Sequence, residues 1–212
     1  MGGGSPDGPE VWRCGPVGAC FLMPPRLLTL VAVIVCGAPL GYLAWQLAAG
    51  QLDPDPAKYL MQGTGSWALR GLVLVLCAAP FARHGWRGLL RFRRMLGVAV
   101  FAYASVHLLL FAQVFVGWDA EVLMEELKER PYVLVGFAAW VLFLPLALTS
   151  TDAARRRLGR RWRLLHRLVY PAAVLAWLHI YWLARSDVSE SLVYGALFIV
   201  LLGWRLRRWQ MG

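Results

Sequence analysis

The segment LGRRWRLLHRLVYPAAVLAWLHIYWL, residues 158–183, decides the class of fold. It opens with a cluster of arginines and continues as a long apolar run that contains two histidines, His166 and His179, thirteen residues apart. A helix of about 20 apolar residues crosses a lipid bilayer. An ionisable side chain is costly in hydrocarbon unless it has a partner, so the two histidines predict a function within the membrane.

The composition of the whole chain is that of a membrane protein. Of its 212 residues, 59% are hydrophobic and 16% are charged, whereas soluble domains carry about 25% charged residues. In a soluble protein the formal charge of +10 would suggest nucleic acid as a partner, but these arginines lie between apolar runs, so we expect no nucleic acid. The cysteines, Cys14, Cys20, Cys36 and Cys77, form no CxxC pair and favour neither disulfides nor a metal site.

Six apolar runs predict an all-α integral membrane protein, a six-transmembrane-helix bundle. Continuous runs favour helices over the alternating strands of a membrane barrel. The runs cover residues 27–49, 66–82, 95–117, 132–149, 164–184 and 189–205. We therefore expect a flexible cytoplasmic tail (1–25), one transmembrane domain (26–205) and a basic cytoplasmic tail (206–212), since the start lacks the basic residues of a signal peptide.

The arginines predict the orientation. The loop at 83–94 holds five and the loop at 150–163 holds six, whereas the loops between them are acidic or mixed. By the positive-inside rule, the basic loops and both termini are cytoplasmic. The outer segment DAEVLMEELKERP, residues 119–131, is expected to form a short amphipathic helix on the membrane surface, with Met124 and Leu127 facing the membrane.

A third histidine, His107, lies in the third apolar run. If the third and fifth helices both start at the cytoplasmic side, His107 lies about 18 Å along its helix and His179 about 22 Å along its own. The two imidazoles are then at similar depth in the outer half of the bilayer. Neutral imidazole is a common axial ligand of haem iron, and bundle interiors hold cofactors. We therefore expect one haem between helices three and five, with His107 and His179 as axial ligands.

His166 lies nearer the cytoplasm. We expect it to be the ligand of a second haem or an alternative ligand of the first haem. Its partner on the third helix would stand fourteen residues before His107, where the chain has Arg93. An arginine is suited to a haem propionate or a flavin phosphate rather than to iron. His84, in the preceding loop, is the remaining histidine. On a straight helix His166 and His179 point about 140° apart, and Pro171 between them is expected to distort that helix.

Other features leave the function open. Arg70, expected near the outer end of the second helix, suits lipid headgroups or the propionates of the outer haem. The sequence contains no Walker loop, GxGxxG, GxSxG or HExxH motif, so no catalytic site of its own is visible. One alternative is a haem-free transporter or scaffold whose histidines form hydrogen bonds between helices. Another is a ferric reductase-type cytochrome with a different electron acceptor.

Several segments together resemble one family. They are DPAKYLMQGTGSWALRGLVLVL, APFAR, RFRRMLGVAVFAYASVHLLLF, ERPYVLVGFAAW, LALTSTDAARRRLGRRWRLLHRLVY and LHIYWL, and they cover roughly residues 50–184 in order. The chain resembles the MsrQ (YedZ) family, the haem-binding membrane subunits of the bacterial protein-methionine-sulfoxide reductase system, within the ferric reductase-like transmembrane superfamily. The block TST…RLGRRW…LHRLVY is the most specific part.

The resemblance implies a b-type cytochrome of the bacterial inner membrane that passes electrons outward. The partner would be a periplasmic molybdopterin-dependent methionine sulfoxide reductase that repairs oxidised proteins. The electron donor would be the quinone pool or a cytoplasmic flavin reductase, and FMN would bind beside haem b. The functional histidines of the family match His107, His166 and His179. Arg93 stands where four-histidine relatives carry a ligand of the inner haem, so the resemblance is compatible with either one haem or two.

Overall fold

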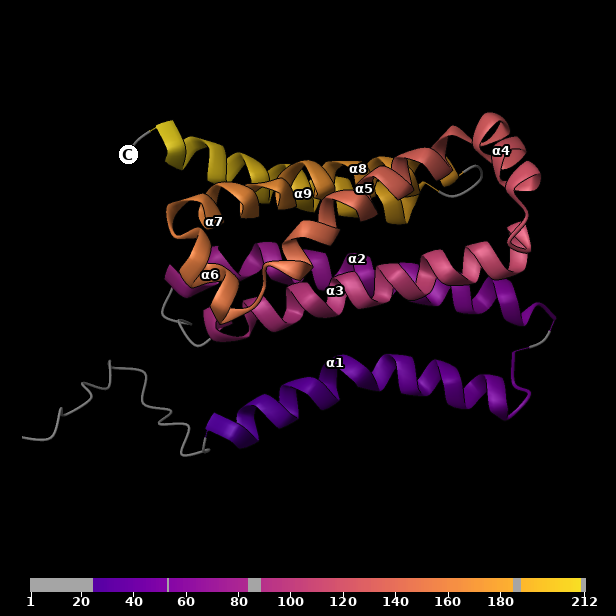
Figure 1. Cartoon of the computed structure of the whole chain (residues 1–212), viewed down its shortest axis with the longest axis horizontal. Helices are drawn as coiled ribbons and strands as arrows, with labels where there is room; N and C mark the ends of the chain where they lie inside the picture. The colour runs from indigo at the N-terminus through magenta and orange to yellow at the C-terminus, as the bar shows by residue number, and fades with distance from the viewer. Residues whose placement is uncertain (1–24, 53, 84–88, 185–187, 211–212) are drawn as a thin grey trace, which may run out of the picture.

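The structure is a computed structural model that describes residues 25–52, 54–83, 89–184 and 188–210 (Figure 1). Within these ranges all regular structure is helical, as predicted. The helices are α1 (Pro25–Ala48), α2 (Pro56–Arg83), α3 (Leu89–Phe111), α4 (Ala120–Glu129), α5 (Pro131–Leu148), α6 (Asp152–Leu158), α7 (Arg160–Leu165), α8 (Val169–Leu183) and α9 (Ser189–Gln210). A π-helical turn, Ala112–Val116, extends α3, and a 3₁₀ turn, His166–Leu168, joins α7 to α8. The expected tail at 1–25 lies outside the described residues except for Pro25, whereas residues 206–210 of the expected C-terminal tail continue α9 as far as Gln210.

Five helices in the described part of the chain are long and apolar enough to cross a membrane. They cover Thr29–Ala48, Pro56–Arg83, Phe92–Val116, Pro131–Leu148 and Ser189–Arg207. The second begins ten residues before the expected start at 66, because PAKYLMQGTG continues the helix despite its polar residues. Arg70 therefore lies in the middle of α2, and its expected place near the outer end is wrong.

The expected span at 164–184 is not one regular helix. It is divided into α7, a 3₁₀ turn and α8, and α8 alone has only 15 residues. Pro171 explains the division, because it has no N–H to donate to the carbonyl of Arg167 and its ring clashes with that carbonyl. A 3₁₀ turn has about 3.0 residues per turn instead of 3.6, so three such residues rotate the chain by about 60° more than an α-helix. About a single straight axis, this rotation would reduce the expected 140° between His166 and His179 to about 80°.

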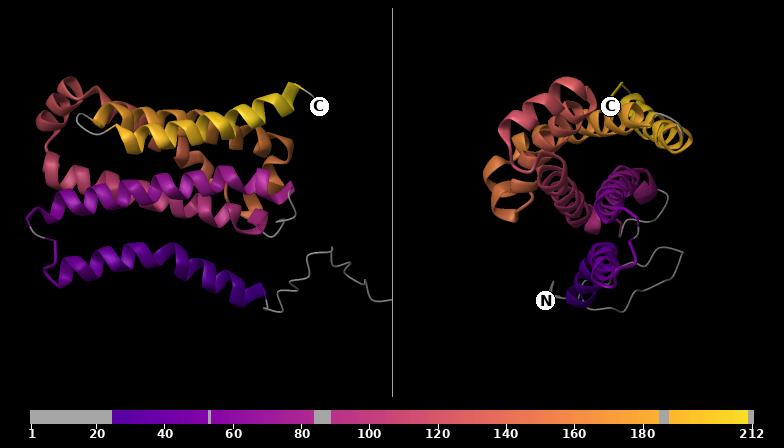
Figure 2. Two further views of the ribbon diagram at one scale, coloured as in Figure 1. Left: turned by 180° about the vertical axis from the view of Figure 1, so that it is seen from behind. Right: turned by 90° about the vertical axis from the view of Figure 1, so that its right-hand side faces the viewer.

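The long helices run in alternate directions between two ends of the bundle (Figures 1 and 2). The start of α3, the short helices α6 and α7 and the last turns of α9 lie at one end, which we call the inner end (Figure 1). α4 lies at the opposite, outer end (Figure 1). The closest packing is between α2 and α3 and between α5 and α8. A core that includes Leu72, Val100 and Ala173 joins the two pairs with α9.

Polar contacts fix both ends. At the outer end the Asp119 carboxylate caps α4 by accepting from the backbone N–H of Glu121 at 2.8 Å. At the inner end Thr151 caps α6, and the Arg94 guanidinium forms an ion pair with Asp152 that ties α3 to α6. The hydrogen bond from Arg94 holds the pKa of the exposed Asp152 carboxyl below its usual value.

The helix α1 lies at the periphery of the bundle and is bent (Figure 1), and it contains Pro39 in its interior. The hydroxyl of Tyr103, on α3, is inserted into its backbone ladder at this bend. Leu40 N–H donates to the Tyr103 hydroxyl at 3.1 Å, and the hydroxyl donates to the carbonyl of Cys36 at 2.8 Å. In a straight helix Leu40 N–H would bond to Cys36 directly, so the inserted hydroxyl and Pro39 together account for the bend.

Candidate functional site

The two histidines expected at similar depth meet in the structure. His107 comes from α3 and His179 from α8. Their ring centroids are 6.3 Å apart and the rings are nearly perpendicular, at 85°. Both side chains are half-buried. The structure thus places side by side the two imidazoles for which the sequence predicted a similar depth.

Each of these imidazoles is held by one backbone carbonyl. The Nδ1 of His107 lies 2.9 Å from the carbonyl oxygen of Met61 on α2, and the Nδ1 of His179 lies 2.6 Å from that of Tyr132 on α5. A carbonyl oxygen only accepts hydrogen bonds, so each Nδ1 carries the proton and donates it. In a neutral imidazole the other nitrogen, Nε2, is then unprotonated, and its lone pair can coordinate a metal.

Two glycines leave room for the rings. A Cβ at Gly65, on α2, would lie 3.2 Å from Nδ1 and Cε1 of His107. A Cβ at Gly136, on α5, would lie only 2.6 Å from Nδ1 of His179. The absence of a side chain at each position lets an imidazole approach the neighbouring helix closely enough to reach its backbone carbonyl.

The residues present fit a haem, whose iron His107 and His179 would hold through their Nε2 atoms. An imidazole nitrogen coordinates a first-row metal at about 2 Å, and the ring centre lies about 1 Å further away, so two rings sharing one ion have centroids about 6 Å apart. The 6.3 Å separation of His107 and His179 agrees with this value. In the described part of the chain no three His, Cys, Asp or Glu residues gather as a metal-ion site. A two-donor pair suits haem, because the porphyrin supplies the remaining ligands of the iron.

His166 lies apart from this pair. Its ring stacks on that of Trp162, with centroids 3.9 Å apart, and its Nδ1 lies 3.1 Å from the carbonyl of Trp162. Trp162 is itself fixed, since its Nε1 donates to the carbonyl of Thr149 at 2.9 Å. No second histidine faces His166 among the described residues, and His84 lies outside them.

The arginines expected to contact a cofactor differ in their surroundings. Arg70 is exposed, and its guanidinium lies 5.0 Å from the centre of the Trp67 ring, also exposed on α2. Arg93 is half-buried near the start of α3. Arg205, on α9, is also half-buried, and its guanidinium lies 5.2 Å from the centre of the Tyr170 ring on α8.

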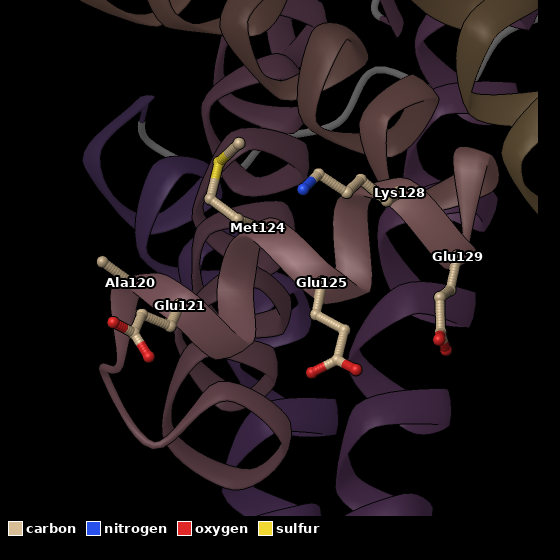
Figure 3. A pocket seen from close by; sticks show the side chains of 6 residues that line it. All are labelled: Ala120, Glu121, Met124, Glu125, Lys128 and Glu129. Carbon is tan, nitrogen blue, oxygen red and sulfur yellow. The ribbon is translucent and has the colours of Figure 1, made fainter.

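A groove follows α4 at the outer end of the bundle (Figure 3). The side chains of Glu121, Glu125 and Glu129 extend from one side of this helix, and Met124 and Lys128 extend from the other (Figure 3). The expected amphipathic helix therefore exists. Glu126, by contrast, is partly buried and pairs with Arg130 at 3.0 Å.

Comparison with known protein families identifies the class of membrane protein to which the chain belongs. The family model for the ferric reductase like transmembrane component matches residues 64–177, which is more than half of the chain. The protein thus belongs to this class of membrane proteins. The matched range includes His107 and His166, all of α3 and α5 and most of α2, and it ends two residues before His179.

Curated relatives narrow the assignment. A protein of Xanthomonas euvesicatoria is 43% identical over 185 residues, which cover 85% of each chain. A protein of Azospira oryzae is 41% identical over 85% of this chain and 76% of its own. Both are named protein-methionine-sulfoxide reductase heme-binding subunit MsrQ. The chain belongs to the MsrQ family. No solved structure gives a significant match.

Proposed function

We propose that the chain is the haem-binding electron-transfer subunit of a protein-methionine-sulfoxide reductase system. One observation carries the proposal: His107 and His179 lie 6.3 Å apart, each with Nδ1 on a backbone carbonyl and Nε2 available to a metal. The names of the MsrQ relatives support it, since they describe heme-binding subunits. A haem b held by these residues would supply one-electron transfer between the two faces of the membrane.

The protein's own residues fix where that transfer takes place. Met61 and Tyr132 hold the two imidazoles in the required tautomer, and Gly65 and Gly136 let them approach. We infer that the divided segment from α7 to α8 also crosses the membrane, because it runs between the two ends of the bundle (Figure 1). The bundle then has six spans in the bacterial inner membrane, with both termini cytoplasmic.

We assign the partners by side of the membrane. The acceptor is a periplasmic molybdopterin-dependent methionine sulfoxide reductase that docks at the outer end. The donor is the quinone pool or a cytoplasmic flavin reductase at the inner end, where FMN would bind. His166 is then the ligand of a second haem or a relay residue nearer the donor, and Arg93 and Arg70 are contacts for propionates or a flavin phosphate.

A haem-free scaffold is the second candidate, because both histidines do form hydrogen bonds between helices. The absorption spectrum of the purified full chain separates the two. We expect a Soret band and a low-spin reduced spectrum that His107→Ala or His179→Ala converts to five-coordinate or haem-free protein, since axial ligands set retention and potential. His166→Ala should keep the low-spin haem spectrum, but electron transfer from the donor to the haem should be slower. A colourless protein, or loss of the low-spin signal in His166→Ala alone, contradicts the assignment.

A further inference from the structure

Two pairs of helices each hold one histidine of the proposed haem site. α2 and α3 pack closely, and the carbonyl of Met61 on α2 holds His107. α5 and α8 also pack closely, and the carbonyl of Tyr132 on α5 holds His179. The pair α5 and α8 lies above the pair α2 and α3 in Figure 1. The distance and the angle between the imidazoles therefore depend on how the two pairs dock on each other.

A hydrogen bond between side chains joins the two pairs close to the histidines. The Nε1–H of Trp140, on α5, donates to the Oγ of Ser105, on α3, at 3.0 Å. The Ser105 hydroxyl in turn donates to the carbonyl of Phe101, one turn earlier on α3, at 2.8 Å. Because the hydroxyl proton is directed to that carbonyl, a lone pair of Oγ is left to accept from the indole.

The indole of Trp140 is also fixed by two aromatic rings. It stacks on Phe101 of α3, with centroids 5.8 Å apart and planes at 24°. It stacks on Phe137 of its own helix at 6.0 Å and 20°. Stacked aromatic pairs add to the hydrogen bond, so the indole is a rigid spacer between α3 and α5.

This spacer lies within about one helical turn of both imidazoles. Ser105 is two residues before His107, which corresponds to about 3 Å along α3. Trp140 is four residues, about one turn, after Gly136 on the same face of α5. Gly136 is the position at which a Cβ would lie 2.6 Å from Nδ1 of His179. A change in the Trp140–Ser105 contact would therefore move the two ligands relative to each other.

We propose that Trp140 and Ser105 are positioning residues that set the separation and the mutual angle of the two haem ligands. Their hydrogen bond holds α5 against α3, so that the imidazole rings of His107 and His179 stay 6.3 Å apart and nearly perpendicular, at 85°. Groups behind metal ligands commonly fix ligand orientation in this way. The inference rests on the proposed function, because it concerns the ligands of the haem proposed there.

Electron paramagnetic resonance of the oxidised full chain tests the proposal. In a low-spin ferric haem with two imidazole ligands, the largest g value rises as the two ring planes approach a right angle. Trp140→Phe keeps an aromatic ring but removes the N–H, and Ser105→Ala removes the acceptor. Each should lower the largest g value and broaden the signal while haem stays bound. Ser105→Thr keeps the hydroxyl and should retain the wild-type signal.

Two comparisons separate positioning from a general loss of stability. The double variant of Trp140→Phe and Ser105→Ala should shift the g value no further than either single change, since both remove the same hydrogen bond. Trp118→Phe is the matched control, because it also removes an indole hydrogen bond, to Gln113 at 2.7 Å. That bond lies at the outer end of α3 and does not join the two pairs, so the g values should stay unchanged.

The spacing of the helix pairs can also be measured without haem. Nitroxide labels at Val98 on α3 and Val141 on α5, both exposed, are attached in a chain whose four native cysteines are replaced by serine. Pulsed electron paramagnetic resonance should give one narrow distance distribution for this chain. Trp140→Phe and Ser105→Ala should each broaden it.

Four results would overturn the proposal and leave the haem assignment intact. They are wild-type g values in both Trp140→Phe and Ser105→Ala, an equal shift in Trp118→Phe, additive shifts in the double variant, and label distances that neither change alters. A lower midpoint of thermal unfolding with unchanged g values would show a merely structural role. A colourless wild type, by contrast, would contradict the proposed function itself.

Discussion

At the scale of single residues, the ionisable side chains were predictable and the spaces around them were not. Histidine is rare in apolar runs, and a rise of 1.5 Å per residue was enough to place His107 and His179 at one depth. Gly65 and Gly136 carry no such signal, because the chain has 21 glycines and only the packing of helices shows which ones touch a ring. The same holds for Arg205, because nothing in the sequence separates it from the other arginines near the end of the chain.

The glycines give the first prediction. Gly136→Ala places a Cβ 2.6 Å from Nδ1 of His179, a distance that forces the ring or α5 to move. We expect a shifted or lost low-spin haem spectrum. Gly65→Ala, at 3.2 Å from His107, should act in the same direction but more weakly. Gly97→Ala meets nothing within 4 Å and should leave the spectrum unchanged. An unaltered spectrum in Gly136→Ala would exclude His179 as a closely packed ligand.

At the scale of elements, periodicity predicted the helices but not their irregularities. The start of α2 was misplaced because polar residues such as Lys58 and Gln62 do not prevent a helix that packs on its neighbours. Pro171 did predict a distortion in the fifth segment, but its form, a 3₁₀ turn, depends on which carbonyl loses its donor. The bend of α1 depends on a partner 67 residues away, the Tyr103 hydroxyl on the Cys36 carbonyl, which local sequence cannot show.

This bend gives a prediction about α1. Tyr103→Phe removes the hydroxyl that bridges Leu40 N–H and the Cys36 carbonyl. We expect faster amide hydrogen exchange around Leu40 and weaker attachment of α1, with an effect of about 1 kcal/mol, the net value of a typical hydrogen bond. Tyr42→Phe is the control, because the Tyr42 hydroxyl accepts a hydrogen bond at 3.2 Å from the Gln46 amide of the same helix. Equal exchange at Leu40 in both variants would show that Pro39 alone makes the bend.

At the scale of the whole molecule, the alternation of arginine-rich and acidic loops predicts one orientation. The helices alternate between the two ends (Figure 1), and the arginine-rich helices α6 and α7 lie opposite α4. Reporter fusions after Gly85 and Arg157 should therefore be cytoplasmic, and fusions after Asp55 and Glu126 should be periplasmic. A periplasmic signal after Arg157 would reverse the whole bundle and the direction of electron flow.

The outer end gives the last prediction, about docking of the acceptor. Charge reversal on α4 tests this docking, and the neighbouring residues Glu125 and Glu126 are not equivalent targets: Glu125 is exposed, whereas Glu126 pairs with Arg130. Glu121, Glu125 and Glu129 form the free acidic side of α4 (Figure 3). Because complementary charge mainly raises association rates, Glu125→Lys should slow electron delivery to the periplasmic reductase, most at low salt, without changing the haem spectrum. Glu126→Gln should disturb α4 itself and leave salt dependence unchanged. Identical transfer kinetics in Glu125→Lys and the wild type, measured by stopped flow, would remove α4 from the docking surface.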